Sequence, residues 1–412
     1  MFGLIDGNNF YVSCERAFDP TLIGRPVIVL SNNDGCAIAR SAEAKALGIK
    51  MGEVWHLSRR KPEYRNVIAK SSNYALYGDM SRRVFEVLSD HFARVEPYSI
   101  DEMFLDLTAF ARVDYYRRVR ERVRRVTKIP TCIGIGPTKT LAKLANKHAK
   151  TATGVSDFSD LEVRREAFAT MPVTEIWGVG RAHQTRLNDL GVVTVEQFAA
   201  LPSASVRKLM TVTGQRTHAE LNGLSCLPLT LAPQQRQTVA VTRMFGRLVE
   251  TWTEMREALA AHASRAAEKC RRHGLVAQGM QVFFHTHPHN GDPWHHGQRS
   301  FEIEPTSDSL ALIGQAVAAG RAMWRAETRY AKCGVILLDL QSAAEAPRDL
   351  LPTGDPERSE KLMLALDAVN ARFGRGTLRP GGIGKVTPWS TRADHRSPRY
   401  TTRLSDLMEV KA

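Results

Sequence analysis

The sequence has no hydrophobic run that approaches the roughly 18 residues needed to cross a membrane. Its first apolar stretch ends at Asp6, which is too short for a signal peptide. The six cysteines are scattered and form no CxxC pair, so neither a zinc ribbon nor a disulfide framework is indicated. Internal repeats and low-complexity tracts are also missing. Together these absences favour a folded protein of the reducing cytoplasm.

Acidic residues are scarce relative to basic ones. The 43 Asp and Glu stand against 57 Lys and Arg, which gives a net charge of +14 and a pI near 9.7. Such a balance favours a polyanionic partner, nucleic acid first and an anionic membrane surface second. Because no membrane-binding device is present, nucleic acid is the leading partner. With 43% hydrophobic and 24% charged residues, the 412 positions predict roughly two to four ordinary folded domains.

Hydrophobic periodicity predicts alternating strands and helices in the first 160 residues. The expected elements are strands at 2–5, 27–30 and 131–136, β-rich sequence at 95–107, and a helix over 74–88. The arginine-rich segment 114–128 is predicted as a helix with a single apolar stripe. The stripe residues are Tyr116, Val119, Val123 and Val126. Thr138 is the expected N-cap of a further helix over 138–150.

The rest of the chain predicts a helical region, a linker and a small mixed domain. Residues 172–201 indicate short helices joined by a Gly-Val-Gly hairpin, and residues 229–237 an aperiodic linker. Over 238–340 the expected order is β-α-β-β-α-β, a ferredoxin-like arrangement. Residues 341–412 are rich in Pro, Gly and Arg and predict an extended tail with one helix near 357–372.

Three acidic residues lie in strand-like sequence, where a charge is costly. Asp6 ends an apolar strand, and Asp101 and Glu102 stand side by side within YSIDEMFLDL. Neighbours on a regular strand point to opposite faces, so these two reach one site only if the chain turns there. A pair of Mg²⁺ ions would relieve the repulsion and would suit phosphoryl transfer. On spacing alone, surface hairpin acids and a turn-forming Asp6 explain the pattern equally well.

Several longer motifs share one resemblance. They are MFGLIDGNNFYVSCE, LSNNDGCAIARSAEAKALGIKMG, SSNYALYGDMS, YSIDEMFLDLT, GIGPTKTLAKLANKHAK and WGVGR. In order and spacing they resemble the Y-family DNA polymerases over essentially the whole chain. The terminal SPRYTTRLSDLMEVK resembles the UmuC-like branch of that family, the catalytic subunits of DNA polymerase V.

The resemblance implies an α+β multidomain fold with the right-hand shape of a polymerase. Its parts are a ferredoxin-like palm, small fingers, a helical thumb with a helix-hairpin-helix, a β-α-β-β-α-β little finger and a C-terminal extension. The corresponding ranges are 1–10 and 74–161 for the palm, 11–73 for the fingers, 162–232 for the thumb, 238–340 for the little finger and 341–412 for the extension.

The resemblance also assigns the acids. Asp6, Asp101 and Glu102 match the catalytic, metal-binding triad of the family, which holds two Mg²⁺ ions. The main-chain carbonyl of Gly7 is a further expected ligand. Asp106, two residues beyond Phe104, is expected to pair with a nearby base instead of a metal.

The incoming dNTP is expected to lie against aromatic and basic residues. Tyr11 takes the place of the family's sugar gate, whose ring leaves no room for a 2′-hydroxyl, and Phe10 packs beside it. Without the resemblance, a Phe-Tyr pair would be read as buried core. Lys45 and Lys150 match positions that bind the nucleotide, and Lys143 lies along the same helical face as Lys150 and is expected to contact DNA. A solvated face is the ordinary explanation of such a lysine stripe.

Contacts to DNA phosphates are expected from two regions. EIWGVGR resembles a helix-hairpin-helix, in which glycines let backbone N–H groups approach phosphate oxygens. Its candidate residues are Gly178, Gly180 and Arg181. The candidates in the little finger are Arg243, Arg247 and Arg299, each of which, taken alone, also fits a solvated surface residue.

Two segments follow no simple pattern. HTHPHNGDPWHHG (285–297) has five histidines, but it lacks cysteines and helical H-x3-H spacing, so a loop between strands explains it better than zinc. EAPRDLLPTG (345–354) stands where UmuC-like proteins carry a sliding-clamp motif. Leu350 and Leu351 supply a hydrophobic plug, but the glutamine and the final phenylalanine of that motif are missing, which weakens the expected binding to the clamp.

The resulting hypothesis is a template-directed DNA polymerase that joins a dNTP to a primer 3′-OH and copies damaged templates with low fidelity in the SOS response. The implied partners are primer-template DNA, a processed UmuD-type dimer and RecA, in the cytoplasm at the nucleoid. One rival is a non-catalytic adaptor of the same family, opposed by the intact acidic triad. Another is a nucleotidyl cyclase with a similar palm, opposed by the glycine hairpin and the second basic domain.

Overall fold

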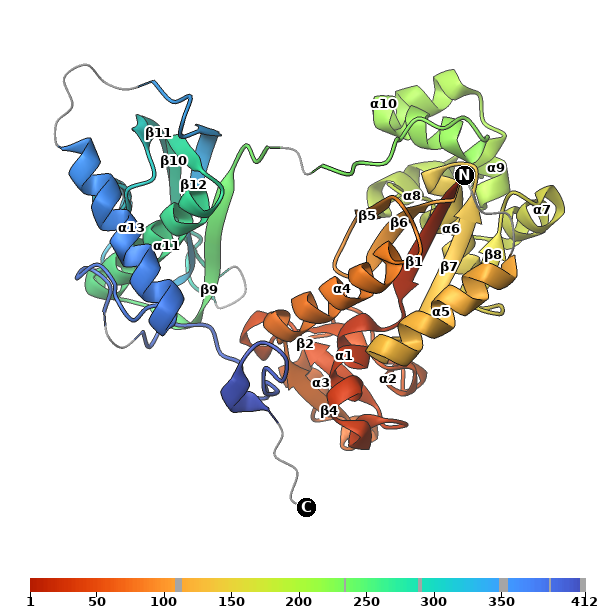
Figure 1. Ribbon diagram of the computed structural model, residues 1–412, viewed down its shortest axis with the longest axis horizontal. Helices are drawn as coiled ribbons and strands as arrows, with labels where there is room; N and C mark the ends of the chain where they lie inside the picture. The colour runs from red at the N-terminus through yellow and green to blue at the C-terminus, as the bar shows by residue number, and fades with distance from the viewer. Residues whose placement is uncertain (108–112, 233–234, 288–290, 348–354, 385–386, 408–412) are drawn as a thin grey trace. The chain divides into compact units, whose positions relative to one another are not determined.

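The computed structural model describes residues 1–107, 113–232, 235–287, 291–347, 355–384 and 387–407. The chain divides into two compact units, Met1–Pro233 with Asp394–Ala412, and Gln234–Ala393 (Figure 1). Each unit combines sheets with helices, which confirms the expected α+β class. Within the described ranges, no helix is long and apolar enough to span a membrane.

A five-stranded sheet of order β5-β6-β1-β7-β8 forms the centre of the first unit. Its strands are β1 (Phe2–Gly7), β5 (Val95–Pro97), β6 (Glu102–Asp106), β7 (Thr131–Gly136) and β8 (Val155–Asp157). Side chains alternate across the central strand β1. Ile5 packs into the core on one face, while Leu4 packs with Phe104 and Ala142 on the other. Asp6 therefore shares the face of Leu4.

Helices cover both faces of this sheet. The core that contains Ile5 is completed by α1 (Phe10–Phe18), α4 (Tyr74–Ser89) and α5 (Val113–Thr127), and the other face carries α6 (Lys139–Ala149). Thr138 caps α6 as expected and accepts a hydrogen bond from the Leu141 N–H at 3.2 Å. The helix lies very close to β7, since a Cβ atom at Gly134 would be 2.0 Å from the Asn146 nitrogen. Only glycine allows this approach.

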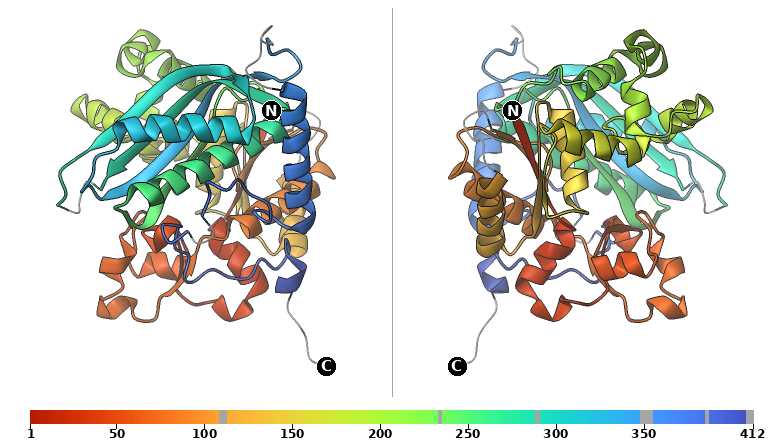
Figure 2. Two further views of the ribbon diagram at one scale, coloured as in Figure 1. Left: turned by 90° about the vertical axis from the view of Figure 1, so that its left-hand side faces the viewer. Right: turned by 90° about the vertical axis from the view of Figure 1, so that its right-hand side faces the viewer.

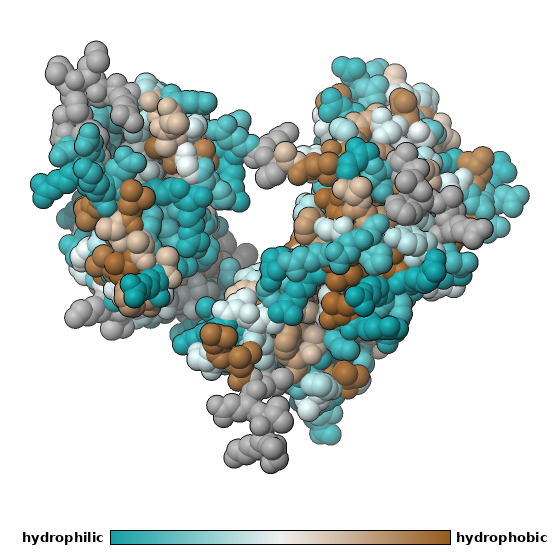
Figure 3. Space-filling model, viewed as in Figure 1, coloured by the Kyte–Doolittle hydropathy of each residue, from teal (hydrophilic) through white to brown (hydrophobic). Residues whose placement is uncertain are grey.

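The apolar stripe predicted for α5 is right at three positions and wrong at the fourth. Tyr116, Val119 and Val123 are buried, but Val126 is 49% exposed. At about 100° per residue, Val126 is rotated far from the line of Tyr116, whereas Thr127 falls almost on it and is buried instead. The outer surface of α5 is rich in arginine and hydrophilic (Figure 3).

Two smaller parts complete the first unit. A three-stranded sheet of order β3-β2-β4 consists of β2 (Val27–Leu30), β3 (Ala37–Arg40) and β4 (Ile68–Ser71), with the short helices α2 (Ala42–Ala46) and α3 (Trp55–Ser58). A separate apolar core is built by α7 (Leu161–Thr170), α8 (Arg181–Asp189), α9 (Val195–Ala199) and α10 (Ser203–Leu221). The element before the Gly-Val-Gly hairpin is a single 3-10 turn, Val173–Glu175, and not a full helix.

The second unit confirms the expected β-α-β-β-α-β order. Its elements are β9 (Val239–Val249), α11 (Trp252–Arg272), β10 (Leu275–Thr286), β11 (His296–Thr306), α12 (Ser309–Met323) and β12 (Tyr330–Ser342). The sheet order is β11-β10-β12-β9, and both helices lie over one of its faces (Figure 2). The tail helix α13 (Pro356–Phe373) agrees with the prediction near 357–372.

A buried ion pair joins three parts of the first unit. Lys139, the first residue of α6, is only 4% exposed, and its ammonium contacts the Glu96 carboxylate of β5. The same carboxylate accepts the backbone N–H of Thr230 at 2.8 Å, in the segment that follows α10. Lys139 therefore does not belong to a solvated lysine stripe; it holds a helix, a strand and a connecting segment together.

We expect Lys139→Met to lower the free energy of unfolding of the first unit by about 3–5 kcal/mol, because Glu96 is then buried without a counter-charge. Lys147→Met on the same helix is the control, since the Lys147–Glu175 pair is partly exposed, with 53% and 30% of the side chains accessible, and exposed pairs contribute only about 0–1 kcal/mol. Urea denaturation followed by tryptophan fluorescence measures both variants. Equal unfolding midpoints for the two would contradict the role given to Lys139.

Candidate active site

Two carboxylates face each other at the end of β1. In the antiparallel register, Asp6 of β1 lies directly opposite Glu102 of β6. Both side chains fall on the sheet face that carries Leu4, Phe104 and α6. Directly opposed residues have Cβ atoms only about 4.5–5.5 Å apart, so two like charges there destabilise the strand pair unless a cation is near.

Asp101 joins them through a turn. β5 ends at Pro97, and the chain turns over residues 98–101 before β6 begins at Glu102. The Ser99 hydroxyl donates to Asp101 Oδ1 at 2.7 Å, and the Gly7 N–H donates to the Asp101 carbonyl at 2.9 Å. This turn removes the strand alternation that would otherwise separate Asp101 from Glu102, as the sequence required.

Lysines at α6 neutralise two of these carboxylates. Lys150 Nζ, at the C-terminal end of the helix, lies 2.8 Å from Asp6 Oδ1, and Lys143 Nζ contacts Glu102 Oε1. Burial raises the pKa of Asp6, Lys150 opposes that rise, and the charges of Asp101 and Glu102 add to it. The two lysines that were expected to meet phosphates or DNA thus share one site with the acids.

The oxygen donors at this site fit a hard divalent cation. Three carboxylates at one end of a sheet are the ligands that Mg²⁺ prefers in proteins. In the part of the chain that the structure describes, no three His, Cys, Asp or Glu side chains form a ready-made metal cluster. Two of the three carboxylates are instead paired with lysines, Asp6 with Lys150 and Glu102 with Lys143.

Gly7 and Phe10 are packed against each other beside the acids. A Cβ atom at Gly7 would lie 2.8 Å from Phe10 Cδ2, so a larger residue would displace the phenylalanine ring. Phe10 itself is 4% exposed and belongs to the core of the first unit. The ordinary interpretation of Phe10 as a core aromatic therefore accounts for its position, and its contact with a nucleotide stays a prediction.

Tyr11 lies in a cluster of three tyrosines. Its ring stacks on that of Tyr77 with centroids 4.4 Å apart and an interplanar angle of 15°, and the Tyr74 ring meets it edge-on at 6.1 Å. Burial raises the pKa of Tyr11, with further increases from Tyr74 and Asp101. Tyr11 is therefore partly buried, close to the acids, and held by an aromatic neighbour that the sequence alone did not assign to it.

Lys45 is a third cation near the acids. It donates from Nζ to Asn9 Oδ1 at 2.6 Å, and Asn9 has the left-handed conformation (φ 49°) that begins α1. Burial lowers the pKa of Lys45, and the positive charges of Arg40 and Lys150 lower it further. Positive charges that lower the pKa of a neighbouring lysine repel one another, and an anion placed between them would relieve that repulsion.

The candidate DNA contacts are spread over both units. Gly178 has φ 91°, a conformation that favours glycine, and Gly180 is the N-cap of α8, which begins at Arg181. A Cβ atom at Gly178 or Gly180 would have no neighbour within 4 Å, so this hairpin is open to a ligand. The binding of DNA by these three residues stays a prediction.

In the second unit, the candidate arginines are all exposed. Arg243 donates to the Thr242 carbonyl, Arg247 pairs with Glu254, and Arg299 lies opposite Val282 on the edge strand β11. These contacts leave the three side chains at the surface of the sheet. Their contact with DNA also stays a prediction.

Other expectations have mixed outcomes. Asp106 pairs with Arg94, whose Nε donates at 2.7 Å, as the sequence predicted for a structural acid. Among the described residues, the histidine segment forms no metal cluster, while His289 lies outside them. Leu350 and Leu351 of the clamp-like stretch also lie outside the described residues.

The partners Tyr77, Asn9 and Ser99 were not found from the sequence. Tyr77 lies within SSNYALYGDMS, a motif that carries the family resemblance but implies no role for this tyrosine. A tyrosine four residues into a helix is ordinarily read as core, and Tyr77 is indeed fully buried. Its stacking on Tyr11 depends on the packing of α1 against α4, which no local pattern encodes.

Comparison with known proteins places this geometry in a family. Models of the impB/mucB/samB family and of its C-terminal domain match residues 5–147 and 236–350, and a domain of unknown function matches residues 360–410. The chain is 42% identical to the protein UmuC of Salmonella typhimurium over the full length of both, and 41% identical to the protein SamB of Salmonella typhimurium, again over the full length of both.

A solved structure shares the fold. The Y-family DNA polymerase chimera Dbh-Dpo4(243-245)-Dbh aligns with a TM-score of 0.66 and 18% identity, covering 83% of this chain and all of that one. At this identity the likeness concerns the fold, and the full-length relatives carry the assignment. The chain therefore belongs to the impB/mucB/samB family and has the fold of a Y-family DNA polymerase.

Proposed function

We propose that this chain is a template-directed DNA polymerase that carries out error-prone translesion synthesis in the SOS response. One observation supports it above all others: Asp6, Asp101 and Glu102 converge at the end of a central strand, beside the cations of α6. The family includes a protein named UmuC with full-length similarity. The alternative structural explanation, surface hairpin acids, does not account for a buried Asp6 paired with Lys150.

The three carboxylates would hold two Mg²⁺ ions, with the Gly7 carbonyl as a further ligand. When bound, these ions would stabilise the negative charge that develops during nucleotidyl transfer. The turn at Ser99 and the strand register would hold the oxygen donors close together in the metal-free protein. Until then, Lys143 and Lys150 offset the mutual repulsion of the acids.

The basic residues of the site are proposed to bind the triphosphate. Lys45 and Lys150 each lower the cost of placing an anion next to the acids, and Lys150 is 37% exposed in its side chain, so it can turn from Asp6 towards a phosphate. The primer 3′-OH then attacks the α-phosphate and pyrophosphate departs among these cations. Lys143 is proposed to face the DNA once its contact with Glu102 is released.

Tyr11 is proposed to select deoxyribose. Its ring is fixed between Tyr77 and Tyr74. A rigid ring under the sugar would clash with a 2′-hydroxyl, whereas a mobile ring would move aside. Phe10, buried below, supports the start of α1 from the core side.

DNA is proposed to bind at the open glycine hairpin and at the second unit. Backbone N–H groups at Gly178, Gly180 and Arg181 would meet phosphate oxygens near the start of α8, where the helix dipole favours negative charge. Arg243, Arg247 and Arg299 would add phosphate contacts. The net charge of +14 supports a polyanionic partner.

Work on damaged DNA is proposed to need other proteins. By similarity to UmuC, the partners would be a processed UmuD-type dimer and RecA, in the cytoplasm at the nucleoid. Sliding-clamp binding would be weak, because the stretch with Leu350 and Leu351 lacks the glutamine and the phenylalanine of the usual motif.

One assay separates this function from its rivals. Purified protein is given a primed template that is either intact or carries an abasic site, with Mg²⁺ and dNTPs, and with or without a UmuD-type dimer and RecA. A polymerase extends the primer, an adaptor binds DNA without extending it, and a nucleotidyl cyclase consumes nucleoside triphosphates with no template. Bypass of the abasic site that requires the partners would support the SOS role.

We expect Asp101→Asn to reduce primer extension by about 100-fold or more, because it removes one carboxylate from the site proposed for the metals. Binding to primer-template DNA, measured by fluorescence anisotropy, should be retained. Asp106→Asn is the matched control: this acid belongs to the same segment but pairs with Arg94. Extension by the Asp101 variant at the rate of the control would remove Asp101 from the triad.

We expect Tyr11→Ala to raise ribonucleotide incorporation by about tenfold or more, a change that corresponds to roughly 1.4 kcal/mol of lost discrimination. Tyr11→Phe keeps the ring stacked on Tyr77 and should discriminate as the parent does. Single-nucleotide insertion with matched dNTP and rNTP gives the ratio of the two kcat/KM values. An unchanged ratio in Tyr11→Ala would exclude the gate role.

A further inference from the structure

The C-terminal segment 394–407 is docked on the first unit through buried polar groups, in a region matched by a domain of unknown function. Ser397 is 6% exposed and Asn73 is 2% exposed. Asn73 Nδ2 lies 3.0 Å from Ser397 Oγ and 3.1 and 3.0 Å from the carbonyls of Ser397 and Pro398. Asn73 also caps α4, accepting the Leu76 N–H at 3.4 Å. Asn73 thus joins the C-terminal segment to the first turn of α4.

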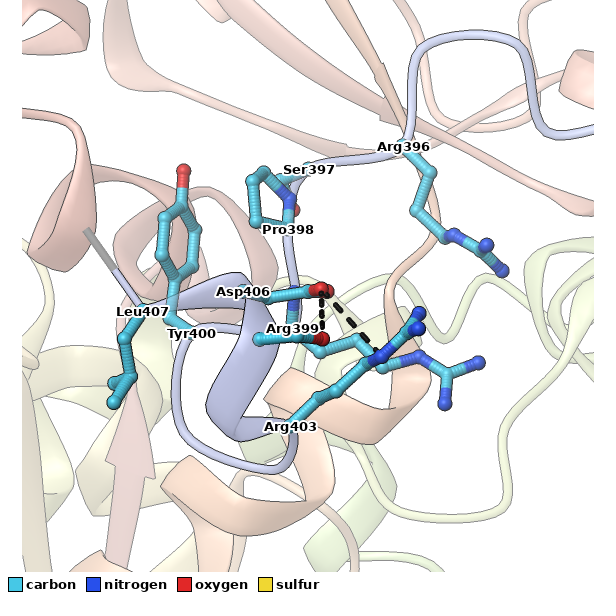
Figure 4. Close-up of a pocket in the computed structure, with 9 residues that line it drawn as sticks. Arg396, Ser397, Pro398, Arg399, Tyr400, Arg403, Asp406 and Leu407 are labelled. Atoms are coloured by element: carbon cyan, nitrogen blue, oxygen red, sulfur yellow. Dashed lines mark hydrogen bonds and ion pairs between the residues drawn. The ribbon is translucent and has the colours of Figure 1, made fainter. Parts of the chain in front are cut away.

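Contacts on either side hold this segment in register. The backbone of Ser71 at the end of β4 donates to the His395 carbonyl at 3.1 Å, and the His395 N–H donates to Ser71 Oγ at 2.9 Å. Further along, the Tyr400 ring stacks on Phe18 of α1 with centroids 4.8 Å apart. Tyr400 and Ser397 both appear in Figure 4. The extended tail expected from composition is therefore irregular but anchored.

A buried carboxylate connects the segment to α1 and α4. Glu15 is 1% exposed, and its Oε1 accepts hydrogen bonds from Tyr77 Oη at 2.7 Å and from Ser397 Oγ at 3.0 Å. Burial raises the pKa of Glu15, and these two donors oppose the rise. A buried carboxyl group without hydrogen-bond donors is costly, so the hydrogen bond from Ser397 helps to stabilise Glu15 in this position.

The connection ends at Tyr11. Glu15 lies four residues after Tyr11 on α1, so the two occupy the same side of the helix. The Tyr77 hydroxyl is held by Glu15, while the Tyr77 ring is stacked on Tyr11 at 4.4 Å. Because the hydroxyl lies on the long axis of the ring, this hydrogen bond restrains the direction of that axis and keeps the Tyr77 ring in its position against Tyr11.

We propose that Ser397 is a positioning residue for sugar selection, acting through Glu15 and Tyr77 on Tyr11. The C-terminal segment thereby becomes part of the nucleotide site even though it does not touch the nucleotide. This inference rests on the gate role proposed for Tyr11. A role in stability alone would lower the melting temperature without changing the preference for deoxyribose over ribose, so the two explanations differ in a measurable ratio.

The test measures kcat/KM for one dNTP and the matched rNTP in the full-length protein. Ser397→Ala and Tyr77→Phe each remove one hydrogen-bond donor to Glu15, and both leave an aromatic ring at position 77. We expect each to lower discrimination about three- to tenfold, the size of the net contribution of one ordinary hydrogen bond. The rNTP value should rise while the dNTP value stays within about twofold. Ser405→Ala, an exposed serine of the same segment, is the control and should change neither value.

Epistasis with the gate separates this inference from the proposed function. If Ser397 acts through Tyr11, then Ser397→Ala adds no further loss of discrimination to Tyr11→Ala. Loss of discrimination in Tyr11→Ala with none in Ser397→Ala or Tyr77→Phe would overturn the inference and leave the gate intact. An unchanged ratio in Tyr11→Ala would overturn both. Thermal melts of each variant show that the protein is folded, and Tyr77→Phe carries the test if Ser397→Ala does not fold.

Discussion

The repulsion between Asp6 and Glu102 is the constraint on which the rest of the first unit depends. The strand register sets these carboxylates directly opposite each other, and the turn at Ser99 brings Asp101 to them. A sheet tolerates such a cluster only with positive charge nearby. Lys143 and Lys150 supply it in the protein alone, and divalent cations would supply it in the proposed catalytic state. In the proposed function, the same need for cations would link the stability of the sheet to nucleotide chemistry.

The position of α6 follows from this constraint. Gly134 lets the helix approach β7 more closely than any side chain would allow, and this brings Lys143 and Lys150 within reach of the strand ends. At the other end of the helix, Lys139 is buried against Glu96 and fixes α6 to β5. The helix therefore carries one buried cation that joins it to β5 and two partly exposed cations that are paired with the acids.

The sequence predicted the elements better than their partners. Periodicity gave the strand at 131–136 with its observed bounds and the cap at Thr138, because these depend on local patterns. It failed at Val126, because the spacing of the predicted stripe, about 3.5 residues, departs from the roughly 3.6 residues of a helical turn, and the difference accumulates over ten residues. It gave no sign of Lys139–Glu96 or of Glu15–Ser397, because such pairs are made by chain segments 43 and 382 residues apart. The assignment of the acidic triad rests on the family motifs and stays a prediction, since spacing alone leaves it undecided.

The docked C-terminal segment extends the proposed nucleotide site beyond the residues that would touch a nucleotide. Tyr11 by itself is one aromatic residue at the start of a short helix. Its ring stacks on that of Tyr77, the hydroxyl of Tyr77 donates to the Glu15 carboxyl group, and the same carboxyl group accepts a hydrogen bond from Ser397. Each of these contacts joins elements that are distant in sequence, and each restricts the movement of the side chain before it in the series. Steric selection against a 2′-hydroxyl requires a ring that keeps its position. If Tyr11 is the gate, as proposed, the selectivity of the site therefore depends on this whole series of contacts, which ends at the C-terminal segment.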